Sequence, residues 1–156
     1  MPDLTDADYR RLLDFRDGIR RFLRWSEARA EEAGVTPAQH QLLLAVRGHG
    51  GPAPPSIGDL SGHLLLRHHS IVELVDRAVA AGLVRREHDL DDHRVVHVAL
   101  TAEGAAKLEA LASAHLEEIA RFVSQLQPLV DDGTIPGLGG GGRRVRSPSG
   151  GGARRA

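Results

Sequence analysis

Apolar residues recur every three or four positions along two long segments of this 156-residue chain, which is the spacing of one face of an α-helix. The segments cover about residues 6–33 and 102–130. The first stripe comprises Leu12, Phe15, Ile19, Phe22 or Leu23, Ser26, Ala30 and Ala33, and the second comprises Leu108, Leu111 or Ala112, His115 or Leu116, Ile119, Phe122, Leu126 and Leu129 or Val130. Both segments therefore predict long amphipathic helices.

The predicted terminal helices are too long to serve only the residues between them. A helix of about 28 residues spans roughly 40 Å, which is longer than the winged part that it would have to cover. Their remaining apolar faces predict that two copies of the chain pack through these helices as a two-fold homodimer. The alternative is a pair of helices within one chain that projects into solvent.

Three shorter helices are predicted between these segments, over about residues 37–47, 56–64 and 68–81. Thr36 and Ser56 each offer a capping hydroxyl at a helix start. The glycine- and proline-rich segment 48–55 cannot continue a helix, because glycine and proline disfavour helical backbone for different steric reasons. Gly82 is the expected stop of the last short helix.

Two extended segments, at about residues 83–88 and 94–100, follow these helices, and the acidic stretch between them predicts a hairpin loop. Two short helices followed by a hairpin are the layout of a winged helix-turn-helix. The predicted fold is mainly α with a small β-hairpin, a winged helix-turn-helix that dimerises through its N- and C-terminal helices. The predicted domain covers residues 1–132, with the winged part at about 53–100.

Charge is unevenly distributed along the chain. The last segment, residues 133–156, holds five of the 20 Lys and Arg residues and none of the 21 Asp and Glu residues. The body is therefore acidic, and it can bind a polyanion only through local placement of cationic groups. Segment 133–156, rich in glycine and arginine, is predicted to be disordered, and it could either hold DNA loosely or be an inert extension.

Composition excludes several classes of function. The absence of cysteine removes disulfides, thiolate zinc sites and cysteine nucleophiles, and it fits a reducing compartment such as the cytoplasm, the expected location. No run approaches the roughly 18 to 20 uncharged apolar residues that cross a bilayer, so no membrane partner is expected. The chain has no phosphate-binding glycine loop, nucleophile with a paired base, or zincin motif, and so neither an enzyme nor a cofactor is predicted.

The run from Leu74 to Gly104 resembles the core signature of MarR-type transcriptional regulators, the multiple antibiotic resistance regulators. The matching parts are Val75-Asp76-Arg77, Gly82-Leu83-Val84-Arg85-Arg86, the wing residues Asp89, Asp92 and Arg94, and Leu100-Thr101-x-Glu103-Gly104. The resemblance extends over roughly residues 8–130. It implies a dimer that binds a palindromic operator in double-stranded DNA, often as a repressor released by a small ligand.

The resemblance also implies which residues contact DNA. The fourth helix would read the major groove, while Arg94 would enter the minor groove with its direction set by Asp92. The expected DNA-binding residues are Arg67, His68, His69, Ser70, Glu73, Arg77, Asp92 and Arg94. Glu73 could accept from a cytosine amino group, although pairing with Arg77 one turn on is the favoured interpretation.

The sequence departs from the family pattern at His93, where many relatives have another arginine. Since the reference pKa of histidine is about 6.5, protonation of His68, His69 and His93 near pH 6 is expected to tighten DNA binding.

A small-molecule effector is expected in a cleft between the dimer helices and the winged part, bordered by Trp25, His40 and Arg47. Packing in the core or the dimer interface is the alternative for Trp25. Two other functions stay open, namely a winged-helix module that binds protein and a histidine-based metal sensor. A metal site would have to draw on scattered residues such as His40, His63 and His115, and none is predicted.

Overall fold

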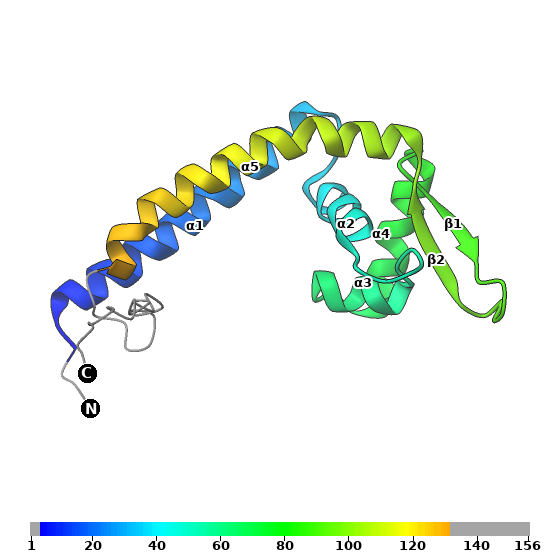
Figure 1. Cartoon of the computed structure of the whole chain (residues 1–156), viewed down its shortest axis with the longest axis horizontal. Helices are drawn as coiled ribbons and strands as arrows, with labels where there is room; N and C mark the ends of the chain where they lie inside the picture. The colour runs from blue at the N-terminus through cyan, green and yellow to red at the C-terminus, as the bar shows by residue number, and fades with distance from the viewer. Residues whose placement is uncertain (1–3, 132–156) are drawn as a thin grey trace, which may run out of the picture.

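The computed structural model describes residues 4–131 (Figure 1). In chain order the elements are α1 (Asp6–Glu32), α2 (Pro37–Gly48), α3 (Ile57–Leu64), α4 (His68–Ala80), β1 (Val84–His88), β2 (Val96–Leu100) and α5 (Ala102–Asp131). This architecture confirms the predicted winged helix-turn-helix, mainly helical with one β-hairpin. The tail predicted to be disordered, residues 133–156, lies outside the described residues.

The molecule consists of a compact head and a long arm (Figure 1). The head is residues 37–100, which hold α2, α3, α4 and the hairpin. The arm is α1 lying side by side with α5, and the two helices run in opposite directions. The first turns of α5 cover the head before the helix continues along α1, so α5 belongs to both parts. None of the helices within residues 4–131 is both long and apolar enough to cross a membrane.

Local capping determines where the first three helices begin. Thr5, Thr36 and Ser56 each accept a hydrogen bond from the backbone N–H three residues on, and the side chain at that third position returns a bond to the cap backbone. These capping boxes satisfy backbone donors that a helix start otherwise leaves free. α4 begins differently, because Arg67 holds the cap position without a side-chain bond.

The core of the head is aliphatic and is completed by α5. Its fully or almost fully buried side chains include Leu42, Leu43, Leu60, Ile71, Val75, Leu83, Val98, Leu108 and Leu111. Burying one such side chain contributes roughly 1.5–3 kcal/mol. Since two of these residues come from α5, docking of the last helix contributes to the stability of the head.

The two hairpin strands pair antiparallel, with Val84 opposite Leu100 and His88 opposite Val96. The loop before α3 also pairs with β2. Ser56 forms an antiparallel bridge with His97, and the N–H of Val98 donates to the Pro55 carbonyl at 2.9 Å. Proline lacks an N–H but keeps its carbonyl acceptor, so this proline-rich loop can extend the sheet. The glycine and proline content of the loop predicts only a break between helices and gives no sign of this role.

The junction between the hairpin and α5 is a close backbone contact. Thr101 donates its N–H to Leu83 O at 3.1 Å and its hydroxyl to Gly82 O at 2.6 Å, while its Oγ1 accepts from the N–H of Gly104 at 3.0 Å. A Cβ on Gly104 would collide with the Leu83 carbonyl oxygen. Glycine is therefore required at this position by space, in a helix interior where it otherwise costs stability.

Replacing Gly104 by alanine is expected to lower the free energy of unfolding by about 2 kcal/mol or more, because the added methyl group meets backbone that cannot move aside. Urea denaturation at a fixed protein concentration measures the change. The control is Gly62→Ala, in open space within α3, where alanine should stabilise by about 0.5–1 kcal/mol. Similar free energies of unfolding for the two variants would show that α5 does not make a close contact with the backbone of Leu83.

Candidate nucleic-acid interface

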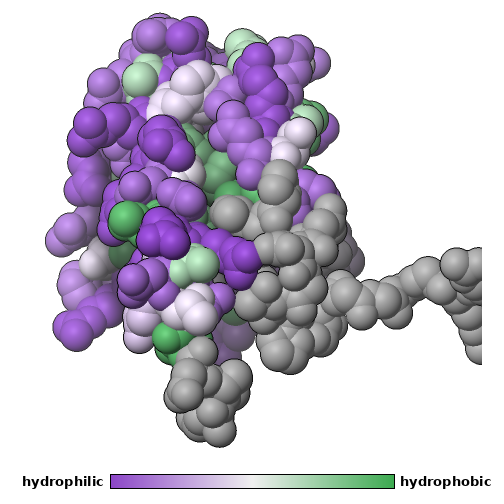
Figure 2. Space-filling view, turned by 90° about the vertical axis from the view of Figure 1, so that its left-hand side faces the viewer, coloured by the Kyte–Doolittle hydropathy of each residue, from purple (hydrophilic) through white to green (hydrophobic). Residues whose placement is uncertain are grey.

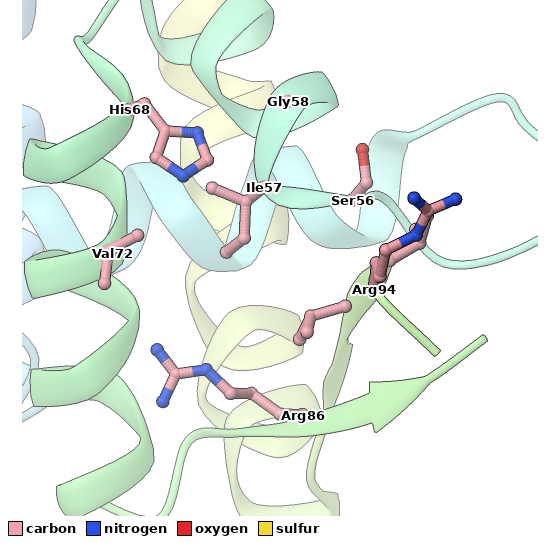
Figure 3. A pocket seen from close by; sticks show the side chains of 9 residues that line it. Ser56, Ile57, Gly58, His68, Val72, Arg86 and Arg94 are labelled. Carbon is pink, nitrogen blue, oxygen red and sulfur yellow. The ribbon is translucent and has the colours of Figure 1, made fainter. Parts of the chain in front are cut away.

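The start of α4, the start of α3 and the hairpin enclose a hollow of about 450 Å³ (Figure 3). Its lining residues are Ser56, Ile57, Gly58, His68, Val72, Arg86, Arg94, Val95 and Val96. No carboxylate is among these nine residues, whereas two arginines and one histidine are. Figure 3 shows Arg86 extending from β1 toward α4 and Arg94 lying on the side of Ser56. The hollow is therefore lined by cationic groups, and the carboxylates that pair with its two arginines, Asp76 and Asp92, lie outside the lining.

α4 presents a polar face beside this hollow because its apolar residues point inward. Ile71, Leu74, Val75 and Ala78 are buried. Of the residues expected to contact DNA, Arg67, His68, His69, Glu73 and Arg77 are exposed and Ser70 is half-buried. The structure thus gathers all six predicted α4 residues at the start and along one side of the same helix.

The favoured pairing of Glu73 with Arg77 is wrong. Within residues 4–131 neither side chain forms an ion pair. The acid that is paired on α4 is Asp76, whose Oδ1 lies 2.6 Å from Nη1 of Arg86. This ion pair joins α4 to β1, and it leaves the guanidinium of Arg77 available for another partner.

The wing loop holds its arginine in one direction. Asp92 Oδ1 accepts from Nε of Arg94 at 3.0 Å, and Oδ2 accepts from Nη2 at 3.1 Å. This two-pronged bond lowers the pKa of Asp92 and raises that of Arg94, whose side chain is 90% exposed. The structure brings together the acid and the arginine that the sequence analysis paired, and their contact with DNA stays a prediction.

Asp89 organises the rest of the loop. Its Oδ1 accepts from the backbone N–H groups of Asp91 and Asp92, both at 2.9 Å, and its Oδ2 lies 2.9 Å from Nε2 of His97. The bond with His97, followed by the two backbone bonds, lowers the pKa of Asp89 to about 2. The carboxylates of Asp89 and Asp92 are therefore engaged within the protein, which reduces their repulsion of phosphate.

His97 is a site residue that sequence reasoning missed. Its Nδ1 lies 2.7 Å from the carbonyl oxygen of Pro54 and its Nε2 faces Asp89, so the ring connects the wing to the loop before α3. The bond to Asp89 is the first cause of a raised pKa for His97. The only signal in the sequence was a histidine within an otherwise aliphatic strand.

Two of the three predicted effector residues lie together where the arm meets the head. His40 is buried and lines a pocket of about 150 Å³ between α1 and α2. The rings of Trp25 and His40 both pack on His115, with centroids 4.9 and 4.6 Å from it. Arg47 is exposed and does not line this pocket. Arg47 lies seven positions after His40 on α2, which is two helical turns or about 10 Å along the axis, and its part in an effector cleft stays a prediction.

His115 connects α5 to α1 by a buried polar contact that the sequence analysis missed. Its Nδ1 lies 2.9 Å from the Leu111 carbonyl, which can only accept. The proton is therefore on Nδ1 in the neutral ring, and Nε2 accepts from the hydroxyl of Ser26 at 2.8 Å. Burial, followed by the neighbouring His115, lowers the pKa of His40. The sequence places Ser26 only in an apolar stripe, and His115 in a stripe or in a scattered metal site.

The metal site considered from His40, His63 and His115 is not assembled. His63 lies instead against His49, with Nδ1 of His49 3.1 Å from Nε2 of His63. Within residues 4–131 no three side chains of the metal-binding types come together in a way that could hold an ion.

Comparison with known proteins identifies the fold. The family model described as the MarR family matches residues 33–95. The HTH-type transcriptional repressor MdtR of Bacillus subtilis (strain 168) is 29% identical over 96 residues, which are 62% of this chain and only 60% of MdtR. The winged helix-turn-helix of this chain is therefore similar to the MarR family over these residues.

Solved structures agree with this assignment at the level of the fold. AbsC, a MarR family transcriptional regulator from Streptomyces coelicolor, superposes with a TM-score of 0.68 at 20% identity, covering 85% of this chain and 91% of AbsC. MepR from Staphylococcus aureus in a complex with DNA superposes with a TM-score of 0.62 at 20% identity, covering 79% of this chain and 85% of MepR.

The buried position of His40 predicts a pH effect on stability. Because its pKa is lower in the folded chain than in the unfolded chain, acid favours the unfolded state, so this contribution to stability is complete above about pH 6.5 and is lost as the pH falls below it. Urea denaturation at pH 7.5 and pH 5.5 should therefore show a smaller acid-induced loss for His40→Asn than for the unmodified chain. The exposed His68→Asn serves as the control, and an unchanged loss in His40→Asn would contradict the prediction.

Proposed function

We propose that this chain is a dimeric, sequence-specific DNA-binding transcriptional regulator, and more specifically a ligand-responsive repressor. The observation that carries the proposal is the wing arginine Arg94, held by Asp92 next to the exposed polar start of α4. MdtR, the curated relative, is named as a transcriptional repressor, and MepR was solved in a complex with DNA. The proposed activity is binding and not catalysis.

α4 supplies the groups suited to a major groove. An α-helix fits this groove, where every base pair presents a distinct pattern of donors and acceptors. Arg67 and Arg77 form no ion pair within residues 4–131 and have the length to reach phosphates. His68, His69, Ser70 and Glu73 are the shorter groups that we assign to base edges.

Arg94 retains donors for a second contact. A guanidinium has five N–H donors, and Asp92 uses two of them, one on Nε and one on Nη2. The other three face outward on a highly exposed side chain. A narrow, A·T-rich minor groove has enhanced negative potential and attracts such a group. Asp92 thus acts by orienting the arginine, while its own charge is compensated.

The arm supplies the surface for a second copy. Its distal part exposes large apolar side chains on both helices: Leu12, Leu13 and Phe15 on α1, and Leu116, Ile119 and Val123 on α5. Figure 2, which views the arm from this end, shows apolar patches among the charged side chains. A group of exposed large apolar side chains on one part of a molecule is a candidate interaction site. We therefore assign residues 1–132 to one unit that combines dimerisation with DNA binding, with the winged part at about 53–100.

A two-fold dimer accounts for a palindromic operator. It presents two copies of α4 to equivalent half-sites, which lie about one turn of DNA, 34–36 Å, apart in helix-turn-helix complexes. An effector bound beside His40 and Trp25 would act where the arm meets the head and would change the separation of the two α4 helices.

Arg94→Ala should weaken binding to operator DNA by about 1–3 kcal/mol, or roughly 5- to 150-fold, with the fold intact. The probe is the intergenic DNA of the protein's own gene that carries an inverted repeat, and binding is measured by fluorescence anisotropy over a series of salt concentrations. Arg20→Ala, on the arm and ion-paired with Asp17 within residues 4–131, is the matched control for loss of one charge.

Affinity that is independent of salt would favour the protein-binding alternative, because neutralising phosphates releases counterions. If Arg94→Ala binds as tightly as Arg20→Ala, the wing is not in the groove.

The double variant Leu12→Gln, Phe15→Gln should shift the chain from dimer to monomer, because it makes the exposed apolar face of α1 polar. Light scattering coupled to gel filtration at several concentrations measures the oligomer. Leu90→Gln, at the wing tip where the leucine is 92% exposed, controls for loss of an exposed leucine away from the arm. A monomeric unmodified chain would overturn the proposed dimer, and an undiminished dimer in the double variant would exclude this face.

A further inference from the structure

We propose that His97 is a positioning residue for Arg94, a doubly protonated clamp between Pro54 and Asp89 that holds the wing in its DNA-reading conformation and releases it on losing a proton. The inference rests on the proposed function and assigns to it a dependence on pH.

The geometry of the ring requires two N–H groups. Nδ1 lies 2.7 Å from the Pro54 carbonyl oxygen and Nε2 lies 2.9 Å from Oδ2 of Asp89. A carbonyl has no proton to give, and the carboxyl of Asp89, with its pKa lowered to about 2, has none near neutral pH. A neutral imidazole has only one N–H, so it can make only one of these bonds. Both bonds together require the positively charged ring.

The surroundings of His97 favour this charge. Asp89 faces the ring from the wing loop, and Asp59 at the start of α3 also favours the protonated form. Glu87, opposite His97 in the strand ladder, pairs with Arg85. The His97 side chain is only 15% exposed, so solvent screens the bond to Asp89 less than it would on the open surface.

The clamp reaches Arg94 through Asp89. The same carboxylate that faces His97 with Oδ2 uses Oδ1 to accept from the N–H groups of Asp91 and Asp92. Asp92 in turn accepts a hydrogen bond from the guanidinium of Arg94. His97 thereby connects the whole loop to the rigid segment before α3, which pairs with β2 through Ser56.

Deprotonation breaks one side of this connection. If the neutral ring keeps its proton on Nδ1 for Pro54, Nε2 presents a lone pair to the carboxylate of Asp89, and the wing loses its anchor. Because the pKa of His97 is raised in the folded chain, the clamp is present at low pH and is lost as the pH rises through that pKa. DNA affinity should therefore fall in the same interval.

Protonation of His68, His69 and His93 would change affinity in the same direction. The experiment is therefore carried out in a background of His68→Gln, His69→Gln and His93→Gln, which removes these three ring charges. Operator affinity is measured from pH 6 to pH 9 at fixed ionic strength. It should fall by up to about tenfold, the effect of a pKa difference of one unit between the free and the bound protein.

Asp89→Asn is the decisive variant. Its Oδ1 can still accept from the two loop amides, while its new NH₂ group replaces Oδ2 and can donate to Nε2 of a neutral His97. The clamp would then hold without a charge, so affinity should stay high at pH 9 and the pH dependence should disappear. His97→Gln should also lose the pH dependence, with low affinity throughout. His88→Gln, on the neighbouring strand, is the control and should behave like the background.

NMR of the free protein supplies a readout that does not depend on DNA. The two ring nitrogens of His97 should both be protonated at pH 7.5, where a histidine of ordinary pKa is mostly neutral. An unprotonated nitrogen at that pH, or an undiminished pH dependence in Asp89→Asn, would overturn the inference while leaving the proposed function standing. Absence of DNA binding at every pH, with His97 still protonated, would overturn the proposed function and the positioning role together.

Discussion

The close contact of α5 with the backbone of Leu83 is the constraint on which the rest of the structure depends. Gly104 allows the helix to approach, and Thr101 satisfies the carbonyls of Gly82 and Leu83 that meet it. α5 then does two things in sequence: its first turns complete the aliphatic core, and its later turns lie along α1. A further bond, from Lys107 Nζ to Ala33 O at 3.0 Å, fixes the end of α1 to the same helix. The arm and α4 are therefore parts of one packed unit.

Elements determined by neighbouring residues could be predicted from the sequence. The helix starts at Thr36 and Ser56 depend on a hydroxyl and a partner three residues on, and the turn at Gly82 depends on a positive φ of 72° that suits glycine. Asp92 and Arg94 are two residues apart in one loop, so their pairing follows from the same local logic. Apolar periodicity likewise identified the inner parts of both stripes, where Ala30 and Leu108 are buried.

Contacts between distant segments could not be predicted in this way. His97 and Pro54 are 43 residues apart, and Ser26 and His115 are 89 apart. Periodicity assigns a residue to a helix face or a strand face, but it does not say which residue lies opposite. For this reason periodicity predicts only packing for Ser26, and the composition of the proline-rich loop predicts only a break between helices. Local spacing can also mislead. Glu73 and Arg77 are spaced so that an ion pair is possible, but this spacing does not require one.

The hydrogen bond between Ser26 and His115 limits how the arm can move. The ring is committed on its other side to Leu111, so it cannot follow a displaced serine by changing its tautomer. Sliding α1 along α5 by a single residue would shift the hydroxyl by about 1.5 Å and separate the pair. Further out, the ring of Phe122 occupies the space that the missing side chain of Gly18 leaves open. Both contacts therefore oppose sliding of α1 along α5, so a displacement at one end of the arm is carried to the other by the two helices together.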